Sequence, residues 1–361
     1  MTRPAGALAA ARLLFDPNPD WAYLDTATYG LPPRPALERM AAVEREWQQG
    51  EADWYGLDRN AESARDDFAS LIRVSPDEVA LIPSISVGVG VVAASLPSSA
   101  EVLLPADEYS SVIMPMLVSA EHRGIRVREV PFDALADAVR PGTHLVAVSS
   151  IQMHTGRAPD LLALVERCAA VGARLLLDAS QGVPFADTSG VIGGVDYLVS
   201  ATYKHLLGPR GCSFFYVRRD RRDELAPFNA NWRAADESAG AFWLGGPLRL
   251  QRTSARFDTA LSLPAWVGTT ESVRLMRRWR DESLFEEVMR LSRRLAAGLG
   301  LPSPASSLVC LPVADPDAAA AALVRAQVRG AIRLGHVRLA PHVWNTDEDV
   351  DRAIEALAPF R

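Results

Sequence analysis

The stretch LVSATYKHLLGPRG, Leu198 to Gly211, contains the chain's single lysine, Lys204. The 361 residues include 38 lysine and arginine side chains, so the remaining 37 are arginines. Arginine can replace lysine wherever a fixed positive charge is enough, but a guanidinium cannot lose its proton and attack a carbonyl group. Schiff-base chemistry requires a primary amine. The sequence therefore marks Lys204 as a candidate Schiff-base lysine; the alternative is an ordinary surface lysine in an arginine-rich composition.

Composition narrows the class of protein. Hydrophobic residues make up 48% of the chain and charged residues 23%, which is typical of a globular protein. A net charge of −6 gives no basic field for nucleic acid or an anionic membrane. The three cysteines have no CxxC spacing, so we expect neither a disulfide framework nor a metal site, and a cytoplasmic location. The N-terminal apolar stretch is too short and interrupted for a signal peptide and predicts a helix.

Short apolar segments alternate with helical patterns between residues 70 and 220. Unbroken apolar segments are typical of strands buried on both faces, and hence of a mostly parallel sheet between helices. The expected strands are residues 78–83, 101–105, 144–152, 174–181, 195–204 and 212–219. Ligands of such sheets bind beyond the carboxyl ends of the strands. We therefore expect Tyr109, Gln152 and Asp178, at or just after strand ends, to face one cleft.

The second half of the chain predicts a smaller unit. Residues 220–265 are irregular and aromatic-rich, which suggests loops over the cleft or a subunit interface. A helical pattern over 266–300 is followed by expected strands and helices at 306–313, 315–328, 331–335, 336–343 and from Thr346, an expected N-cap. We predict a large domain over residues 18–265 and a small α/β domain formed by residues 1–17 and 266–361.

Asp178 gives Lys204 a chemical partner. It ends the apolar segment LLLDASQG, and one further expected strand separates it from Lys204. Adjacent strand ends would bring the acid and the amine to the same cleft. A carboxylate facing an amine-bound ring is what pyridoxal phosphate requires, because it keeps the pyridine nitrogen protonated and the ring electron-accepting.

The segments YLDTATYG, LLLDASQG, ATYKHLLGPRG and RFDTALSLPAW together resemble the class V aminotransferases. This fold-type I pyridoxal-phosphate group includes cysteine desulfurases, kynureninases and isopenicillin N epimerase-like enzymes. The resemblance runs from about residue 20 to the C-terminus, where VRLAPHVWNTDEDVDRAI also fits. It implies a large domain with a mostly parallel, seven-stranded type of sheet, a small C-terminal domain, and pyridoxal 5′-phosphate held as an aldimine on Lys204.

The resemblance also assigns roles around the cofactor. Asp178 matches the partner of the pyridine nitrogen and Gln181 the contact to the phenolic oxygen. Tyr109 matches the aromatic residue that stacks on the ring in kynureninase-like members, and Tyr203 matches a phosphate contact. Further cofactor positions are Ser84 and Ser86 in the expected phosphate loop, Gln152 in place of a family asparagine, and Ser262 near the segment that reaches the partner subunit's phosphate in family dimers.

The substrate and the histidines are assigned in the same way. Arg338 aligns with the arginine that binds the substrate α-carboxylate, with Arg333 as a less favoured alternative. His154 and His205 lie near these motifs, and we interpret both as structural. The segment FNANW, with Asn229, Asn231 and Trp232, shapes the substrate pocket or packs at an interface.

The chain departs from the desulfurase pattern at one position that concerns mechanism. Desulfurases carry a nucleophilic cysteine shortly before the carboxylate-binding arginine, whereas GAIRLGHVRLAP contains none. Cys310 lies in an apolar strand segment and Cys168 in a helical one. The sequence therefore favours a lyase that eliminates a β-substituent, with carbon–sulfur cleavage of a cysteine-type conjugate as the leading case.

Other functions stay open at this level. An aminotransferase or an epimerase needs the same lysine, acid and arginine, and a kynureninase-like hydrolase is a further possibility. The non-enzymatic alternative is a degenerate, cofactor-free binding protein. We expect a small amino-acid substrate, no nucleic-acid or membrane partner, and a homodimer with shared active sites.

Overall fold

The structure is a computed structural model that describes residues 3–236 and 248–361. Its central sheet has the strand order β2-β8-β7-β6-β5-β3-β4. Strand β8 runs antiparallel to both of its neighbours, and the other neighbouring pairs are parallel. The strands are β2 (Val79–Ile82), β3 (Glu101–Pro105), β4 (Arg126–Val130), β5 (Thr143–Ser149), β6 (Arg174–Asp178), β7 (Tyr197–Ala201) and β8 (Ser213–Val217). The expected mostly parallel, seven-stranded α/β fold is confirmed.

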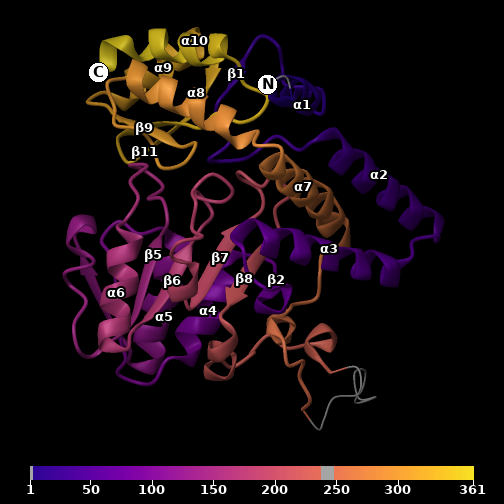
Figure 1. Ribbon diagram of the computed structural model, residues 1–361, viewed down its shortest axis with the longest axis vertical. Coiled ribbons are helices and arrows are strands. Elements are labelled where there is room, and N and C mark those ends of the chain that lie inside the picture. Colours follow the sequence, from indigo (N-terminus) through magenta and orange to yellow (C-terminus); the bar gives the residue numbers. More distant parts are fainter. Residues whose placement is uncertain (1–2, 237–247) are drawn as a thin grey trace.

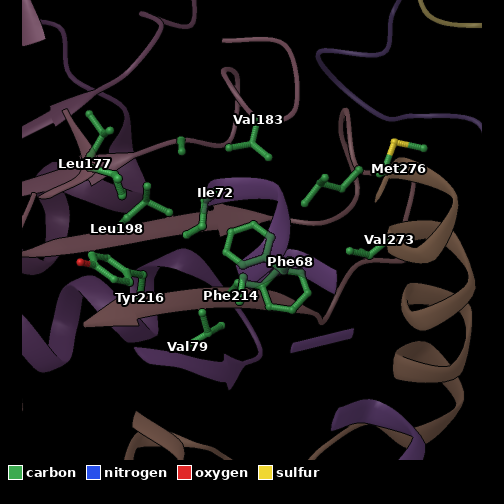
Figure 2. Packing of buried hydrophobic residues seen from close by; sticks show 14 of the residues in the cluster. Phe68, Ile72, Val79, Leu177, Val183, Leu198, Phe214, Tyr216, Val273 and Met276 are labelled. Carbon is green, nitrogen blue, oxygen red and sulfur yellow. The ribbon is translucent and has the colours of Figure 1, made fainter. Parts of the chain in front are cut away.

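Helices bury both faces of this sheet, which explains why its strands are continuous apolar segments (Figure 1). One face packs against α3 (Trp54–Ile72), α6 (Leu161–Val171) and α7 (Leu263–Asp281), and the other against α4 (Ile85–Ser95) and α5 (Ser110–Arg123). Phe68 of α3 stacks on Phe214 of β8 with ring centroids 4.1 Å apart. Figure 2 shows this pair of rings between Ile72 and Val79, with Val273 of α7 nearby.

A small α/β domain lies beside one end of the sheet (Figure 1). Its antiparallel sheet has the order β11-β12-β9, formed by β9 (Val309–Pro312), β11 (Ala331–Arg333) and β12 (His336–Leu339). The pair β1 (Ala22–Tyr23) and β10 (Val328–Arg329) is parallel. The helices are α8 (Phe285–Gly298), α9 (Pro316–Arg325) and α10 (Asp347–Leu357). Thr346 caps α10 by accepting a hydrogen bond from the N–H of Asp349, as expected.

Contacts cross both domain boundaries predicted from the sequence. Strand β1 of the predicted large domain pairs with β10 of the small one. Helix α7, assigned to the small domain from residue 266 onward, packs against α3 and α2 (Arg34–Gln49) of the large one. The boundaries at 17/18 and 265/266 therefore remain predictions, with α7 as the connection between the units.

The structure differs from the predicted elements at two places and confirms the N-terminal helix. The helix expected over 266–300 is two helices, because Ser283 adopts a left-handed backbone with φ of 59° between α7 and α8. No glycine or proline marks this break, so the pattern gave no stop signal. Strand β4 was missed because its residues are half-exposed at a sheet edge. The expected N-terminal helix is present as α1 (Arg3–Arg12).

A buried charge cluster fixes the irregular segment before α7. Asp258 is 1% exposed and accepts hydrogen bonds from Arg65 of α3 and from Arg233. It also accepts one from the N–H of Leu81 in β2, at 2.8 Å. Asn231 donates to the Asp258 carbonyl at 2.8 Å, so it has a structural role in this segment. Each charge is paired, which is the condition under which buried ions are tolerated.

Membrane association through a spanning helix has no support in the described part of the chain. Within residues 3–236 and 248–361, every helix is too short or too polar to cross a bilayer.

Candidate active site

Lys204 sits in a tight turn after β7 and is 5% exposed. The Tyr203 carbonyl accepts a hydrogen bond from the N–H of Gly30, which ties this turn to the N-terminal segment at 2.8 Å. A Cβ on Gly30 would lie 2.3 Å from the Lys204 carbonyl oxygen, so residue 30 must be glycine for this approach. The glycine of YLDTATYG thus positions the lysine from a distant part of the sequence.

Burial makes Lys204 a reactive amine. Desolvation lowers the pKa of Lys204 to about 8, with the charge of Asp178 raising it and those of Arg338 and Arg210 lowering it further. A buried ammonium loses hydration that a neutral amine does not need. The neutral, nucleophilic fraction of Lys204 near physiological pH is therefore much larger than that of an ordinary lysine.

Asp178 occupies the last position of β6, directly beside Val199 of β7 in the parallel register. It is 3% exposed, and its Oδ1 accepts a hydrogen bond from the N–H of Ser180 at 2.9 Å. Because the carboxyl ends of β6 and β7 lie side by side, the acid and Lys204 enter the same cleft. The structure thus brings together the pair inferred from the sequence.

Aromatic rings line this cleft. The Lys204 Nζ lies 5.1 Å from the ring centre of Tyr109 and 5.9 Å from that of Tyr203. The Arg210 guanidinium lies 4.5 Å from the Tyr203 ring and 5.4 Å from that of Tyr29. Burial raises the pKa of Tyr203 to about 12, so its hydroxyl is a hydrogen-bond donor over the physiological range. These positions suit a flat ring above Lys204 and an anionic group near Arg210.

Gln181 is held by two partners. Its Nε2 donates to the Ala27 carbonyl at 3.0 Å, and its Oε1 pairs with His205 Nε2 at 2.8 Å. Because the amide oxygen can only accept, His205 donates from Nε2, and its Nδ1 accepts from the Ser307 hydroxyl at 3.3 Å. One amide N–H of Gln181 remains for a ligand acceptor. His205 has the structural role inferred from the sequence, and the structure shows that it orients Gln181.

Arg338 reaches the cleft from β12 of the small domain and is 4% exposed. Its Nε and Nη2 are buried without a hydrogen-bond partner, and its Nη1 contacts the Met153 sulfur at 3.7 Å. Burial lowers the pKa of Arg338, although the thiol of Cys310 and the carboxylate of Asp25 raise it. Unpaired buried guanidinium nitrogens are rare and costly in a folded protein. Their arrangement suits a carboxylate ligand that binds both nitrogens.

The remaining predicted cofactor residues have these positions. Ser84 occupies the N-cap position of α4, and its hydroxyl lies 3.0 Å from that of Ser86. A helix N-terminus with two hydroxyls suits a phosphate. Gln152 is buried, with its Oε1 accepting from the Thr155 hydroxyl at 2.5 Å. Ser262 is exposed at the N-cap of α7 and makes no capping hydrogen bond, so it stays a prediction that concerns the dimer.

Two contributors were missed in the sequence. Glu108 is buried beside Tyr109 and accepts hydrogen bonds from the N–H of Tyr109 at 2.7 Å and of Ser149 at 2.8 Å. It therefore fixes the loop that presents the Tyr109 ring. Arg210 was hidden among 37 arginines, and its place in GPRG after Lys204 was the available signal.

The three thiols are unsuited to nucleophilic chemistry. Cys168, Cys212 and Cys310 are all free and buried. Burial raises the pKa of each to about 12, so the thiolate that attacks or binds sulfur is scarce. This supports the absence of a desulfurase-type cysteine inferred from the sequence.

We predict that Arg338→Met stabilises the cofactor-free and substrate-free protein by about 1–2 kcal/mol, because it removes a buried guanidinium whose Nε and Nη2 have no hydrogen-bond partner. The matched control is Arg233→Met, which removes a buried arginine paired with Asp258 and should destabilise by about 3–5 kcal/mol. Urea unfolding followed by circular dichroism measures both. Equal destabilisation by the two variants would contradict an unpaired Arg338.

Comparison with known proteins places this geometry in a family. The profile of the Aminotransferase class-V family matches residues 36–311. The chain is 28% identical over 319 residues to the uncharacterized aminotransferase YcbU of Bacillus subtilis (strain 168), covering 85% of each chain. It is 25% identical over 383 residues to a probable cysteine desulfurase of Methanothermobacter thermautotrophicus, covering 94% of each.

Solved structures show the same fold. A structure of the cystine C-S lyase C-DES with its product cysteine persulfide has a TM-score of 0.84 and 22% identity, covering 95% of this chain and 98% of that one. The cysteine desulfurase CsdA of Escherichia coli has a TM-score of 0.78 and 18% identity, covering 99% and 98%.

The residues present also fit the cofactor of this family. A buried amine of lowered pKa, an acid at the neighbouring strand end, an aromatic wall and unpaired guanidinium nitrogens are what pyridoxal phosphate and an amino acid require. The sequence match and the geometry together show that this chain belongs to the class V aminotransferase family and is a pyridoxal-phosphate-dependent enzyme.

Proposed function

We propose that this enzyme is a carbon–sulfur lyase that eliminates the β-substituent of a cysteine-type conjugate. The observation that carries the proposal is a site with the groups for Cα–H removal, Lys204 and Arg338, in a protein whose three thiols are buried with raised pKa values. β-Elimination needs the first set of groups and needs no thiol nucleophile. Desulfuration through a protein persulfide would need a thiolate.

Each residue has a defined task in this proposal. Arg338 binds the substrate α-carboxylate through its unpaired Nε and Nη2 and so orients the Cα–H bond. Lys204 would hold the cofactor through its Nζ, and its neutral amine would accept the Cα proton of the substrate. Asp178 would keep the pyridine nitrogen of the cofactor protonated, and the Tyr109 ring, 5.1 Å from the Lys204 Nζ, would contact the cofactor ring. The bound cofactor supplies an acceptor for the electrons released at Cα.

The overall reaction balances with water as the only added reactant. The Cα–H electrons form the Cα–Cβ double bond as the Cβ–S bond breaks, and the electron pair of that bond leaves on sulfur. The thiolate takes up a proton. Hydrolysis of the remaining three-carbon unit gives pyruvate and ammonia. Nothing is oxidised or reduced overall, so no acceptor is required.

The comparisons support two candidate reactions. The structural neighbour C-DES is described as a cystine C-S lyase, which matches the elimination proposed here. The relative YcbU is described as an aminotransferase, and an aminotransferase would use the same Lys204, Asp178 and Arg338. The difference lies in whether the reaction requires a 2-oxo acid.

We predict that the holoenzyme releases pyruvate and free thiol from cysteine conjugates without any 2-oxo acid. Pyruvate is followed with lactate dehydrogenase and thiol with a disulfide reagent. Lys204→Arg and Asp178→Asn should lower this rate at least about a thousandfold, because they remove the base and the electron-sink partner. Turnover that depends strictly on an added 2-oxo acid would instead establish an aminotransferase.

The lowered pKa of Lys204 predicts a distinct pH dependence of cofactor capture. In cofactor-free protein, the rate of forming a borohydride-trapped adduct with pyridoxal phosphate should rise as pH increases through about 8 and then level off. Only the neutral amine attacks the aldehyde, and an ordinary lysine would keep gaining neutral amine up to about pH 10.4. Lys204 is the single lysine, so the N-terminal amine is the other primary amine that can react. Mass spectrometry of the trapped adduct in Lys204→Arg measures how much the N-terminal amine contributes. A rate that still climbs above pH 9.5 would argue against a perturbed lysine.

We also propose a cytoplasmic homodimer in which the 228–266 region forms part of the interface and brings Ser262 to the partner's phosphate site. Phe228 and Leu248 are 62% and 80% exposed within one chain, and Ser262 is exposed at the start of α7. Residues 237–247 of this region lie outside the described residues. The free, buried thiols suit a reducing compartment.

If each subunit completes the phosphate site of its partner, a change at that shared site should weaken retention of the cofactor. Ser262→Asp would place a negative charge at the partner's phosphate and should weaken cofactor retention about tenfold, measured by the free pyridoxal phosphate that passes an ultrafilter. Light scattering of the wild-type holoenzyme should give twice the chain mass. A monomeric holoenzyme that retains its cofactor would exclude the shared site.

A further inference from the structure

A cavity of about 580 Å³ opens between the two domains, next to the substrate-binding arginine. The loop after β5 forms one wall with Gly156, Arg157 and Ala158, and the small domain forms the other with Pro304, Ala305, Cys310 and His336. The charge of Arg157 is paired with Asp133. This size is within the range of pockets that bind drug-sized ligands. It far exceeds the space that the side chain of cysteine needs.

The strand register joins this cavity to the active site. In the small sheet Arg338 pairs with Cys310, and His336 pairs with Pro312. Directly opposed residues of an antiparallel sheet share a face, and so do residues two positions apart on one strand. Arg338, Cys310, His336 and Pro312 therefore lie on the same face, and the last three line the cavity. The cavity therefore opens on the face of the small sheet from which Arg338 would bind the carboxylate.

His154 lies behind the cavity wall, against the lining residue His336. It is 7% exposed, and its Nδ1 is buried without a hydrogen-bond partner. Its ring meets that of His336 edge to face at 5.6 Å, and the preceding Met153 contacts Arg338. A buried unpaired ring nitrogen costs free energy that a ligand atom can recover. The structural role inferred from the sequence does not account for this free nitrogen.

His154 is also neutral at physiological pH. Burial lowers its pKa, the charges of His336 and Arg338 lower it further, and that of Asp107 raises it. A neutral imidazole offers one donor and one acceptor. It therefore suits an uncharged hydrogen-bonding atom of the ligand better than a carboxylate.

We propose that this cavity is the subsite for the leaving group, and that the substrate carries on sulfur a bulky, largely apolar group with an uncharged hydrogen-bonding atom near the sulfur, which pairs with His154. The inference rests on the lyase function proposed above. It assigns His154 as a specificity-determining residue and the wall formed by residues 156–158, 301–305 and 308–310 as the surface that selects size.

The size of the subsite can be tested with a pair of substrates. Ala305→Trp and Ala158→Trp place an indole at two exposed positions of the cavity wall, and Ala321→Trp on α9 is the control outside it. We expect kcat/KM for S-phenyl-L-cysteine to fall at least tenfold in either cavity variant and that for S-methyl-L-cysteine to change less than twofold. Equal losses for both substrates, or no loss for either, would overturn the subsite.

The hydrogen bond of His154 can be tested with isosteric substrates. S-(2-pyridyl)-L-cysteine differs from S-phenyl-L-cysteine by one ring nitrogen beside the sulfur. We expect His154→Leu to lower the pyridyl-to-phenyl ratio of kcat/KM about three- to tenfold relative to wild type. His154→Gln should restore part of it. The comparison of ratios removes the intrinsic difference between the two leaving groups, and an unchanged ratio would refute the role of His154.

Binding without turnover separates this inference from the proposed function. N-acetyl-S-phenyl-L-cysteine has no free amine and cannot react, but it can occupy Arg338 and the cavity. Calorimetric titration of the holoenzyme should show a Kd about tenfold weaker in Ala305→Trp and unchanged in Ala321→Trp. If wild type turns over no cysteine conjugate but binding follows this pattern, the lyase assignment fails and the binding site stands. An identical Kd in all three proteins overturns the site itself.

Discussion

The burial of two cationic groups in one cleft is the constraint on which the rest of this structure depends. Lys204 and Arg338 are 5% and 4% exposed, burial lowers the pKa of both, and the charge of Arg338 lowers that of Lys204 further. A buried cation with a purely structural role is normally paired with a carboxylate, as Arg65 and Arg233 are paired with Asp258. The cleft instead keeps the lysine partly neutral and the guanidinium unpaired. Both states are useful only when an anionic cofactor and a carboxylate substrate arrive.

The parallel sheet and the small domain divide this task. Asp178 ends β6 and Lys204 lies in the turn that follows β7, so the acid and the amine come from neighbouring strand ends at one edge of the sheet. Arg338 comes from β12 of the small domain, whose position depends on inter-domain contacts such as the hydrogen bond from Ser307 to His205. The proposed carboxylate-binding arginine and the proposed cofactor residues thus come from different units that meet at the cleft. The cavity beside Arg338 is lined by residues of the same two units.

Two buried residues orient side chains that we propose as cofactor contacts. Glu108 holds the loop of Tyr109 through backbone hydrogen bonds, and His205 holds the amide of Gln181 through a single tautomer. Such hydrogen bonds hold a donor or a ring in a fixed position and orientation. Catalysis requires this because a small displacement of a reacting group lowers the rate. His205 is fully buried, and its pKa is lowered far enough by burial that it stays neutral and keeps this tautomer.

The sequence by itself determined the sheet, the reactive lysine and its acid. Unbroken apolar strands and the isolated Lys204 carry strong local signals, because burial on both faces and amine chemistry each restrict the residue types that can serve. What only the tertiary structure decided depends on contacts between distant segments. The break at Ser283 has no glycine or proline to mark it, Glu108 and Arg210 look like ordinary charged residues, and His154 resembled a loop histidine. Its unpaired nitrogen beside Arg338 exists only because β12 folds back onto the loop after β5, and no local pattern encodes that meeting.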